Sequence, residues 1–258
     1  LDNFVNSGFN LIEIKPNRLI TKEIAKNALI KYGNPQLDWL FAIHAAPIRI
    51  SLEYNIPFIM WGEEAESEYG GSDDLKNKTG FDLSHIQKYY RSNIDIKKLL
   101  RKKNHNNSDL YWLTLPENKL FQKSKIYATH WSFYEKWDEH LHLKFAKKYC
   151  GLETTKKNTS GAYNNFSHLD QKMYLLHMYL AYLKFGFGRA TTDASIDIRA
   201  GKLTRNKGLK LVKELDHLFP INFLDDYLNY FQMKRKDFFD HLENFRNKKI
   251  FKLKNKKW

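Results

Sequence analysis

Residues 56–63, read as IPFIMWGE, decide the fold class that this sequence predicts. The run is short, nearly continuous in apolar residues, and ends at Gly62, which is typical of a central strand in a parallel sheet. Such a sheet needs helices on its faces, and the preceding sequence supplies them. The stretch therefore predicts an α/β architecture.

The sequence before this strand reads as one further strand and two helices. Residues 9–14 alternate apolar and polar positions, which favours a strand. Residues 19–32 have apolar positions at helical spacing, and residues 37–54 form a second helix that is apolar on more than one face. Strand, helix, helix and strand is the order of an α/β domain, which we place at residues 1–75.

A loop rich in carboxylates follows the strand, where ligands bind in open α/β sheets. Its sequence, WGEEAESEYGG, gathers four glutamates and two aromatic residues: Glu63, Glu64, Glu66, Glu68, Trp61 and Tyr69. Clustered carboxylates can hold Mg²⁺ or accept hydrogen bonds from sugar hydroxyls. A solvated acidic loop is the competing interpretation.

The remainder of the chain, residues 76–258, lacks a convincing strand pattern and is predicted to be a mainly α-helical region. Several of its segments open on Ser, Thr or Asp, which are favoured helix N-caps. The helices are expected at 84–90, 94–102, 131–149, 168–185, 204–217, 222–230 and 235–246.

Residues 186–214 combine arginines, a lysine, glycines and small hydroxyl residues in what reads as a turn-rich patch before a helix. Guanidinium groups, free backbone N–H groups and a helix N-terminus are what a phosphate requires. A simpler alternative is that Thr204 only caps the helix that begins at Arg205.

Composition limits the classes of partner. The 258 residues carry 43 Lys and Arg against 29 Asp and Glu, a net charge of +14, which favours anionic partners without choosing among them. The single cysteine, Cys150, excludes an internal disulfide, and no apolar run is long enough to span a membrane. We therefore expect a cytoplasmic protein.

Other features carry weaker signals. The basic tail from Lys234 to Trp258 interleaves aromatic residues, but their helical spacing favours packing over nucleic-acid binding. His44 lies on an apolar helix, where a satisfied core histidine is favoured over a catalytic one. The GxSxG, HExxH, Walker A and GxGxxG motifs are absent.

Five segments together resemble the N-acetyl sugar amidotransferase family of PP-loop ATP pyrophosphatases, which act in bacterial surface-polysaccharide and nonulosonate biosynthesis. They are PNRLITKEIAKNAL, AAPIR, IPFIMWGEEAESEYGG, THWSFYEKWDEHLHLKFAKKYCGL and SIDIRAGKLTRNKGLKLVKELD, in the same order and over nearly the whole chain. The resemblance implies part of a HUP-type parallel sheet that binds ATP, followed by the helical region. Members of this family carry an SGGxDS phosphate loop, which this sequence lacks, so we expect an N-terminally truncated copy, with a degenerate copy as the alternative.

The chemistry implied by the family is ATP-dependent conversion of an acetamido group on a nucleotide sugar to an acetamidino group. Adenylation makes the amide oxygen a good leaving group, and ammonia then displaces AMP. The family implies ATP and Mg²⁺ as cofactors, with a glutaminase and a cyclase-like protein as the partners that supply ammonia. Nucleic acid is not an expected partner.

The resemblance also implies site residues. Those expected to bind ATP and its phosphates are Gly62, Glu63, Arg189, Thr192, Ser195, Arg199, Lys202 and Arg205. Those expected to contact the substrate are Trp61, Glu64, Tyr69 and Asp193, and Glu63 is also the candidate Mg²⁺ ligand. No residue stands out as a general base. Two alternatives stay open: another PP-loop reaction such as tRNA thiolation, and a non-catalytic assembly subunit.

Overall fold

A computed structural model describes residues 2–62, 79–80, 82–101, 105–156, 158 and 160–252. The chain divides into two compact units. Unit 1 comprises Leu1–Phe9, Ala28–Gln36 and His140–Trp258, and unit 2 comprises Asn10–Asn27 and Leu37–Glu139. Helix α2 (Arg18–Tyr32) contributes residues to both.

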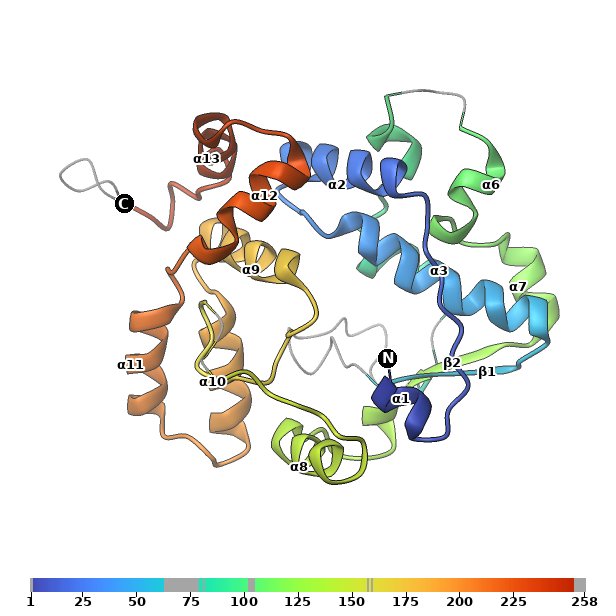
Figure 1. The fold of residues 1–258 in the computed structure, drawn as a ribbon, viewed down its shortest axis with the longest axis horizontal. Coiled ribbons are helices and arrows are strands. Elements are labelled where there is room, and N and C mark those ends of the chain that lie inside the picture. Colours follow the sequence, from blue (N-terminus) through green and yellow to red (C-terminus); the bar gives the residue numbers. More distant parts are fainter. Residues whose placement is uncertain are drawn as a thin grey trace. The chain divides into compact units, whose positions relative to one another are not determined.

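Unit 2 contains a parallel pair of strands packed on a long helix. Strand β1 (Phe58–Trp61) pairs with β2 (Tyr127–His130), with Trp61 opposite His130, and β1 contacts helix α3 (Leu37–Tyr54) (Figure 1). Strand β1 alternates, so that Ile59 faces the core while Phe58 and Met60 are exposed, and Ala128 of β2 faces the same core. The core cluster consists of Ile48, Ile59, Leu83, Ile86, Phe121 and Ala128.

Short helical segments complete unit 2. They are α5 (Leu83–His85), a π-helical segment (Ile86–Tyr90), α6 (Asn107–Leu110), α7 (Asn118–Ser124) and the 3₁₀ segments Ile96–Leu99, Tyr111–Leu113 and Trp131–Phe133. Asp82 and Asp95 cap two of them, because their side chains accept hydrogen bonds from the N–H groups of His85 and Lys97.

Unit 1 is helical in its described residues. Its elements are α1 (Asp2–Asn6), α8 (Glu139–Tyr149), α9 (Lys172–Phe185), α10 (Arg189–Arg199), α11 (Arg205–Leu215), a 3₁₀ turn (Ile221–Phe223), α12 (Leu224–Phe231) and α13 (Arg235–Glu243). Helices α10 and α11 form an antiparallel hairpin, and α13 packs on α9. The rings of Tyr227, Phe231 and Phe238 are fully buried and stack on one another.

The predicted fold class is confirmed, since a small parallel sheet with helices is followed by a helical C-terminal region. The strand at 9–14 is wrong: these residues lie in an extended, mostly exposed segment without strand pairing. Strand β2 was missed, and it falls just before the helix expected at 131–149, which begins only at Glu139. A four-residue strand carries too little alternation to be recognised without its partner.

The turn-rich interpretation is wrong at residues 189–199, which form α10, whereas the helix predicted to begin at Arg205 is confirmed as α11. The residues Thr191, Thr192, Asp193 and Ser195 have modest helix propensity, which local pattern reasoning reads as a turn. Tertiary contacts described below stabilise the helix instead. Within the described part of the chain, no helix is long and apolar enough to cross a membrane.

Candidate functional site

The N-terminus of α10 is capped by a carboxylate from outside the helix. Asp216, which follows α11 and is buried, accepts hydrogen bonds from the backbone N–H groups of Gly188 (2.9 Å) and Thr191 (3.0 Å) and from the Thr191 hydroxyl. Gly188 permits this approach, since a Cβ there would lie 3.0–3.2 Å from atoms of Asp216. The first N–H groups of a helix attract anions, and here the anion is the Asp216 carboxylate of the protein itself.

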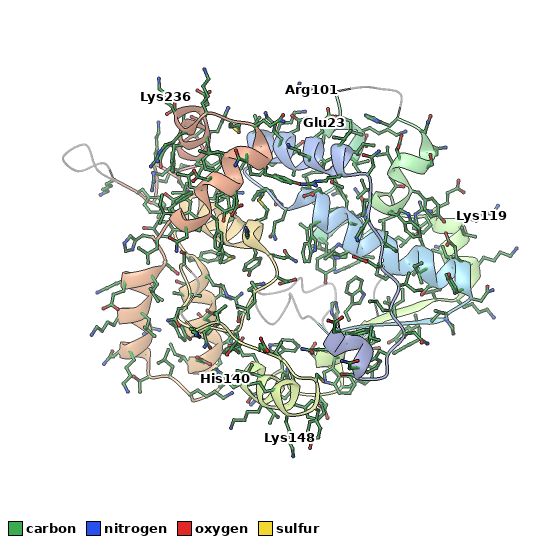
Figure 2. All side chains as sticks on the ribbon, in the orientation of Figure 1. Glu23, Arg101, Lys119, His140, Lys148 and Lys236 are labelled. Carbon is green, nitrogen blue, oxygen red and sulfur yellow. The ribbon has the colours of Figure 1, made fainter. Side chains whose placement is uncertain are left out.

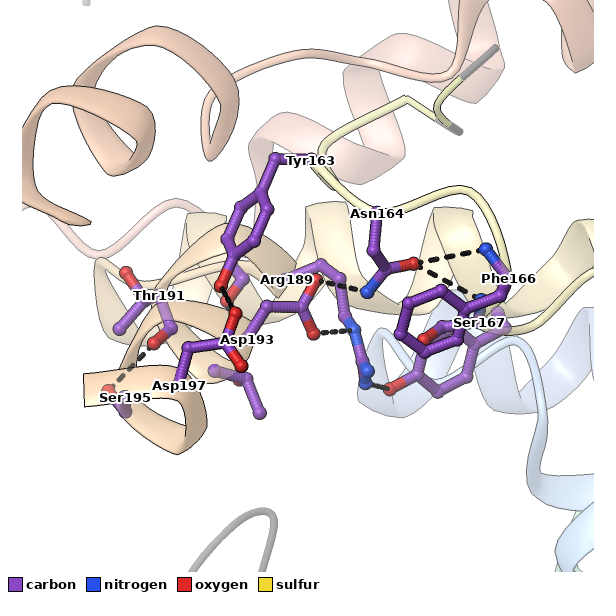
Figure 3. A network of polar contacts seen from close by, with 12 residues as sticks. Tyr163, Asn164, Phe166, Ser167, Arg189, Thr191, Asp193, Ser195 and Asp197 are labelled. Carbon is purple, nitrogen blue, oxygen red and sulfur yellow. Dashed lines mark hydrogen bonds and ion pairs between the residues drawn. The ribbon is translucent and has the colours of Figure 1, made fainter. Parts of the chain in front are cut away.

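One turn into α10, Arg189 and Asp193 form a buried ion pair (Figure 3). The Arg189 Nε lies 2.7 Å from Asp193 Oδ1, and the two side chains are 3% and 1% exposed. Other atoms of the two groups form hydrogen bonds: Arg189 Nη1 donates to the Tyr174 hydroxyl (2.8 Å), and Asn164 Nδ2 donates to Asp193 Oδ2 (3.1 Å). The pair therefore connects α10 to α9 and to the segment preceding it.

A half-buried histidine, His168, lies next to this pair. The His168 ring stacks on Tyr174, with centroids 3.5 Å apart. Burial, together with the positive charge of Arg189, lowers the pKa of His168 to about 3. His168 is therefore neutral near pH 7 and adds no charge to the network.

Asp197 lies farther along α10, where its carboxylate bridges two side chains of unit 1. Its Oδ1 lies 2.8 Å from His140 Nε2 on α8, and its Oδ2 accepts a hydrogen bond from the Tyr163 hydroxyl (2.8 Å). The side chain of Asp197 is 8% exposed, so this bridge is largely shielded from water. It ties α8 and the 160–165 segment to α10.

The structure places five of the predicted site residues on α10: Arg189, Thr192, Asp193 and Ser195 within the helix, and Arg199 at its last position. Arg189 and Asp193 are occupied by each other, while the Ser195 hydroxyl donates to the Thr191 carbonyl (2.7 Å). Thr192 is buried. These residues hold unit 1 together in this structure, and their proposed contacts with phosphate or substrate stay predictions.

Arg199, Lys202 and Arg205 lie in a different environment, around the turn that joins α10 to α11. All three are exposed. The turn is well ordered by hydrogen bonds, since the N–H groups of Lys202 and Leu203 both donate to the Asp197 carbonyl. The three cations therefore lie on an exposed turn, whereas Arg189 and Asp193 are buried.

The capping role considered for Thr204 is confirmed, because its hydroxyl accepts a hydrogen bond from the N–H of Lys207 (3.4 Å). Close helix packing also positions the turn. A Cβ on Gly208 would lie 2.9 Å from Ile198 Cδ1 and 3.4 Å from Ala194 Cβ, so the glycine allows α11 to approach α10 closely.

Unit 2 contains a second candidate position, at the carboxyl ends of β1 and β2. Trp61 and His130 end the two strands side by side, and the Tyr90 hydroxyl lies 3.4 Å from His130 Nε2. The His44 ring stacks on Tyr90, with centroids 4.7 Å apart. Ligands of parallel sheets bind at this edge, so the aromatic and imidazole groups mark where a ligand of unit 2 is expected.

His44 is a satisfied core histidine, as predicted. Its Nδ1 lies 2.7 Å from the Leu40 carbonyl, and only 6% of the residue is exposed. Burial lowers the pKa of His44 to about 4, so the ring is neutral near pH 7. It supports Tyr90 and Trp61 by packing.

Trp61 and Gly62 end at this edge, and Trp61 is packed against the core of unit 2 while Gly62 is exposed. Glu63, Glu64 and Tyr69 lie outside the described residues, so the proposed Mg²⁺ ligand has no structural account. Sequence reasoning missed His130 and Tyr90. The THW sequence at 129–131 held the only signal for His130, and its strand was not expected.

The fold and these sites define a mainly helical protein with a small parallel sheet and a basic surface on its C-terminal helices. Residues 160–258, which contain α9 to α13, match the family model described as LPS biosynthesis protein WbpG-like, C-terminal domain. This match supports a role in lipopolysaccharide biosynthesis. No curated protein matches the chain.

Proposed function

We propose that this chain is part of an ATP-dependent N-acetyl sugar amidotransferase of lipopolysaccharide biosynthesis. In the reaction, the oxygen of an acetamido group on a nucleotide sugar attacks the α-phosphorus of ATP and releases pyrophosphate. Ammonia then adds to the activated carbon, and AMP leaves to give the acetamidino group. ATP supplies the leaving group, without which an amide oxygen does not depart.

The observation that carries the proposal is the match of residues 160–258 to the C-terminal domain of an LPS biosynthesis protein. The resemblance of the other segments to the amidotransferase family adds to it. A parallel strand pair that ends at Trp61 and His130 is compatible with a nucleotide site at the carboxyl edge of a sheet.

The exposed cations of the α10–α11 turn are the best remaining candidates for phosphate contacts. Lys202 and Arg205, with Arg199 beside them, are exposed and place positive charge at the turn between α10 and α11. Gly62 and Glu63 would approach the nucleotide and Mg²⁺, and Mg²⁺ would neutralise charge on the phosphates. Trp61, Glu64 and Tyr69 would contact the sugar or base. These contacts would act by positioning and by electrostatic stabilisation.

ATP–pyrophosphate exchange that depends on a UDP-linked diacetamido sugar tests the reaction, using the complete gene product that carries this sequence. Lys202→Ala and Arg205→Ala should each weaken ATP use about tenfold to a hundredfold, the value of one charged hydrogen bond of about 1.5–3 kcal/mol. Lys213→Ala, an exposed lysine on the same helix, is the matched control.

Unchanged exchange in both variants, with normal folding, would remove these residues from the phosphate site. Absence of sugar-dependent exchange in the unaltered protein would remove the amidotransferase itself. A glutaminase and a cyclase-like protein are the proposed sources of ammonia, so free ammonium salts should replace them in the second half-reaction. We place the reaction in the cytoplasm.

The net charge of +14 favours one alternative, a PP-loop reaction on tRNA. Salt-sensitive tRNA binding together with sugar-independent pyrophosphate exchange would support it. A protein that neither exchanges pyrophosphate nor binds tRNA would instead fit a non-catalytic assembly subunit.

A further inference from the structure

Helix α8 has an unusual exposure pattern within unit 1. It is eleven residues long, and none of its residues is buried. Leu141, Phe145 and Tyr149, spaced four apart, are 61%, 62% and 59% exposed. Residues four apart on a helix lie above one another, so these side chains form one apolar stripe on the solvent side of α8.

A ring contact and a further exposed leucine define the extent of the stripe. The rings of Phe145 and Tyr149 lie 4.6 Å apart between centroids, so they form one continuous aromatic surface. The stripe continues past the helix end to Leu152, which is also exposed. We call Leu141, Phe145, Tyr149 and Leu152, with the lysines described next, the α8 face.

The charged side chains beside the apolar stripe are lysines. Lys144, Lys147 and Lys148 are all exposed, and the acidic residues nearest to them in sequence are Glu139, at the start of α8, and Glu153, after Leu152. Lys148, labelled in Figure 2, extends from the outer side of α8, and its Nζ lies 4.8 Å from the centroid of the Tyr149 ring. At about 100° per residue, Lys144 and Lys148 border the apolar stripe directly.

Helix α1 adds exposed apolar side chains at the C-terminal end of α8. The Asn3 side-chain amide donates to the Gly151 carbonyl (2.7 Å), which anchors α1 there. Phe4 and Phe9 stack with centroids 5.2 Å apart, and both are exposed. The apolar surface of this end of unit 1 is therefore larger than α8 alone provides.

We propose that the α8 face binds the surface of a bilayer that contains anionic phospholipids. Exposed aromatic and aliphatic side chains beside lysines are the composition of helices that lie in the membrane interface. The apolar stripe would enter the acyl boundary, while each lysine stem lies along it and places its ammonium group among the phosphates. A protein interface fits less well, because lysine is depleted from the cores of such interfaces.

This binding needs no membrane-spanning helix, and it is independent of the proposed reaction. It would hold the protein at a membrane surface by reversible contacts that weaken as salt screens the lysines. Cosedimentation with vesicles of phosphatidylcholine, with and without phosphatidylglycerol, measures it directly. The expected result is binding only to vesicles that contain phosphatidylglycerol, decreasing with added salt.

Two variants separate the apolar and the charged parts of the α8 face. Phe145→Ala with Tyr149→Ala removes the aromatic surface, and Lys144→Glu with Lys148→Glu reverses two charges. Each should weaken vesicle binding about tenfold or more, since each removes side chains that contact lipid. All four side chains are exposed, so the variants should melt at the same temperature as the unaltered protein.

Helix α11 provides matched controls, because it also carries an exposed leucine among exposed lysines. Leu209→Ala, and Lys210→Glu with Lys213→Glu, should leave binding within about twofold of the unaltered protein. Equal losses on α8 and α11 would show that only net charge matters and would overturn the proposal. Failure of the unaltered protein to bind anionic vesicles at low salt would overturn it as well.

A second copy of the chain is the alternative occupant of the α8 face. Analytical ultracentrifugation of the same variants distinguishes it. If the α8 substitutions convert a dimer to a monomer and leave vesicle binding unchanged, the face is a self-association surface and the lipid proposal is wrong.

Discussion

Breaking the buried ion pair of α10 should destabilise unit 1 rather than weaken phosphate binding alone. Arg189 was a candidate phosphate ligand, but its Nε lies 2.7 Å from Asp193 Oδ1, and both side chains are almost fully buried. Arg189→Met leaves the Asp193 carboxylate buried without its counterion, and Asp193→Leu does the same to the guanidinium. Removing one partner of such a pair costs about 3–5 kcal/mol.

The contacts that remain in each variant determine where in that range its loss of stability falls. In Arg189→Met, the Asn164 amide still donates to Asp193 Oδ2, while the Tyr174 hydroxyl loses the donor that Arg189 Nη1 provides. We therefore expect losses near the middle of the range, about 4 kcal/mol. At about 2–4 °C per kcal/mol, the midpoint of thermal unfolding should fall by roughly 8–16 °C.

Thermal unfolding followed by circular dichroism is the assay. Arg199→Met, on the same helix but exposed, is the matched control and should change stability by less than about 1 kcal/mol. The double variant, Arg189→Met with Asp193→Leu, should lose less free energy of unfolding than the two single variants lose together, because it leaves no unpaired buried charge.

An unchanged midpoint in Arg189→Met, together with loss of ATP use, would refute this reasoning. It would mean that the guanidinium faces the nucleotide in the working protein. The opposite result, unfolding with additive losses in the double variant, would mean that packing rather than charge dominates at this position.

Two further predictions concern stability. Gly208→Leu should cost about 1–3 kcal/mol in urea unfolding, because the new side chain meets Ile198 and Ala194, whereas Asn206→Leu on the exposed side of α11 should not. The pKa of His44 in the folded protein, about 4, lies below the ordinary histidine value of 6.5, so its stability contribution is complete above pH 6.5 and is lost as pH falls toward 4. That loss amounts to about 3 kcal/mol, and His44→Leu should abolish it. Burial raises the pKa of Asp38 to about 7, which acts in the opposite direction, so the comparison is the difference between His44→Leu and the unaltered protein at each pH. An equal pH dependence in the two proteins would contradict the assignment.

Local pattern was sufficient for the long helices. The spacing of apolar residues in 19–32 and 37–54 corresponds to α2 and α3, and Gly33 ends α2 with a positive φ of 57°. The apolar run before Gly62 likewise became β1. These features depend on residues close in sequence, so a single chain reveals them.

Local pattern was insufficient where distant residues stabilise an element. Strand β2 exists because β1 lies beside it, and their sequences are separated by more than sixty residues. Helix α10 begins where Asp216, from beyond α11, accepts its first N–H groups. The composition of residues 186–214 indicated a charged, polar segment, but not which of its charged side chains are buried and which are exposed.

The sequence by itself thus determined the fold class, the helices of strong periodicity and the basic character of the C-terminal region. Tertiary structure alone decided which charges are buried and which are exposed. It pairs Arg189 with Asp193 in the interior and leaves Arg199, Lys202 and Arg205 at the surface. The physical reason is that a buried charge must be paired to offset its desolvation, and the partner is known only once the chain is folded.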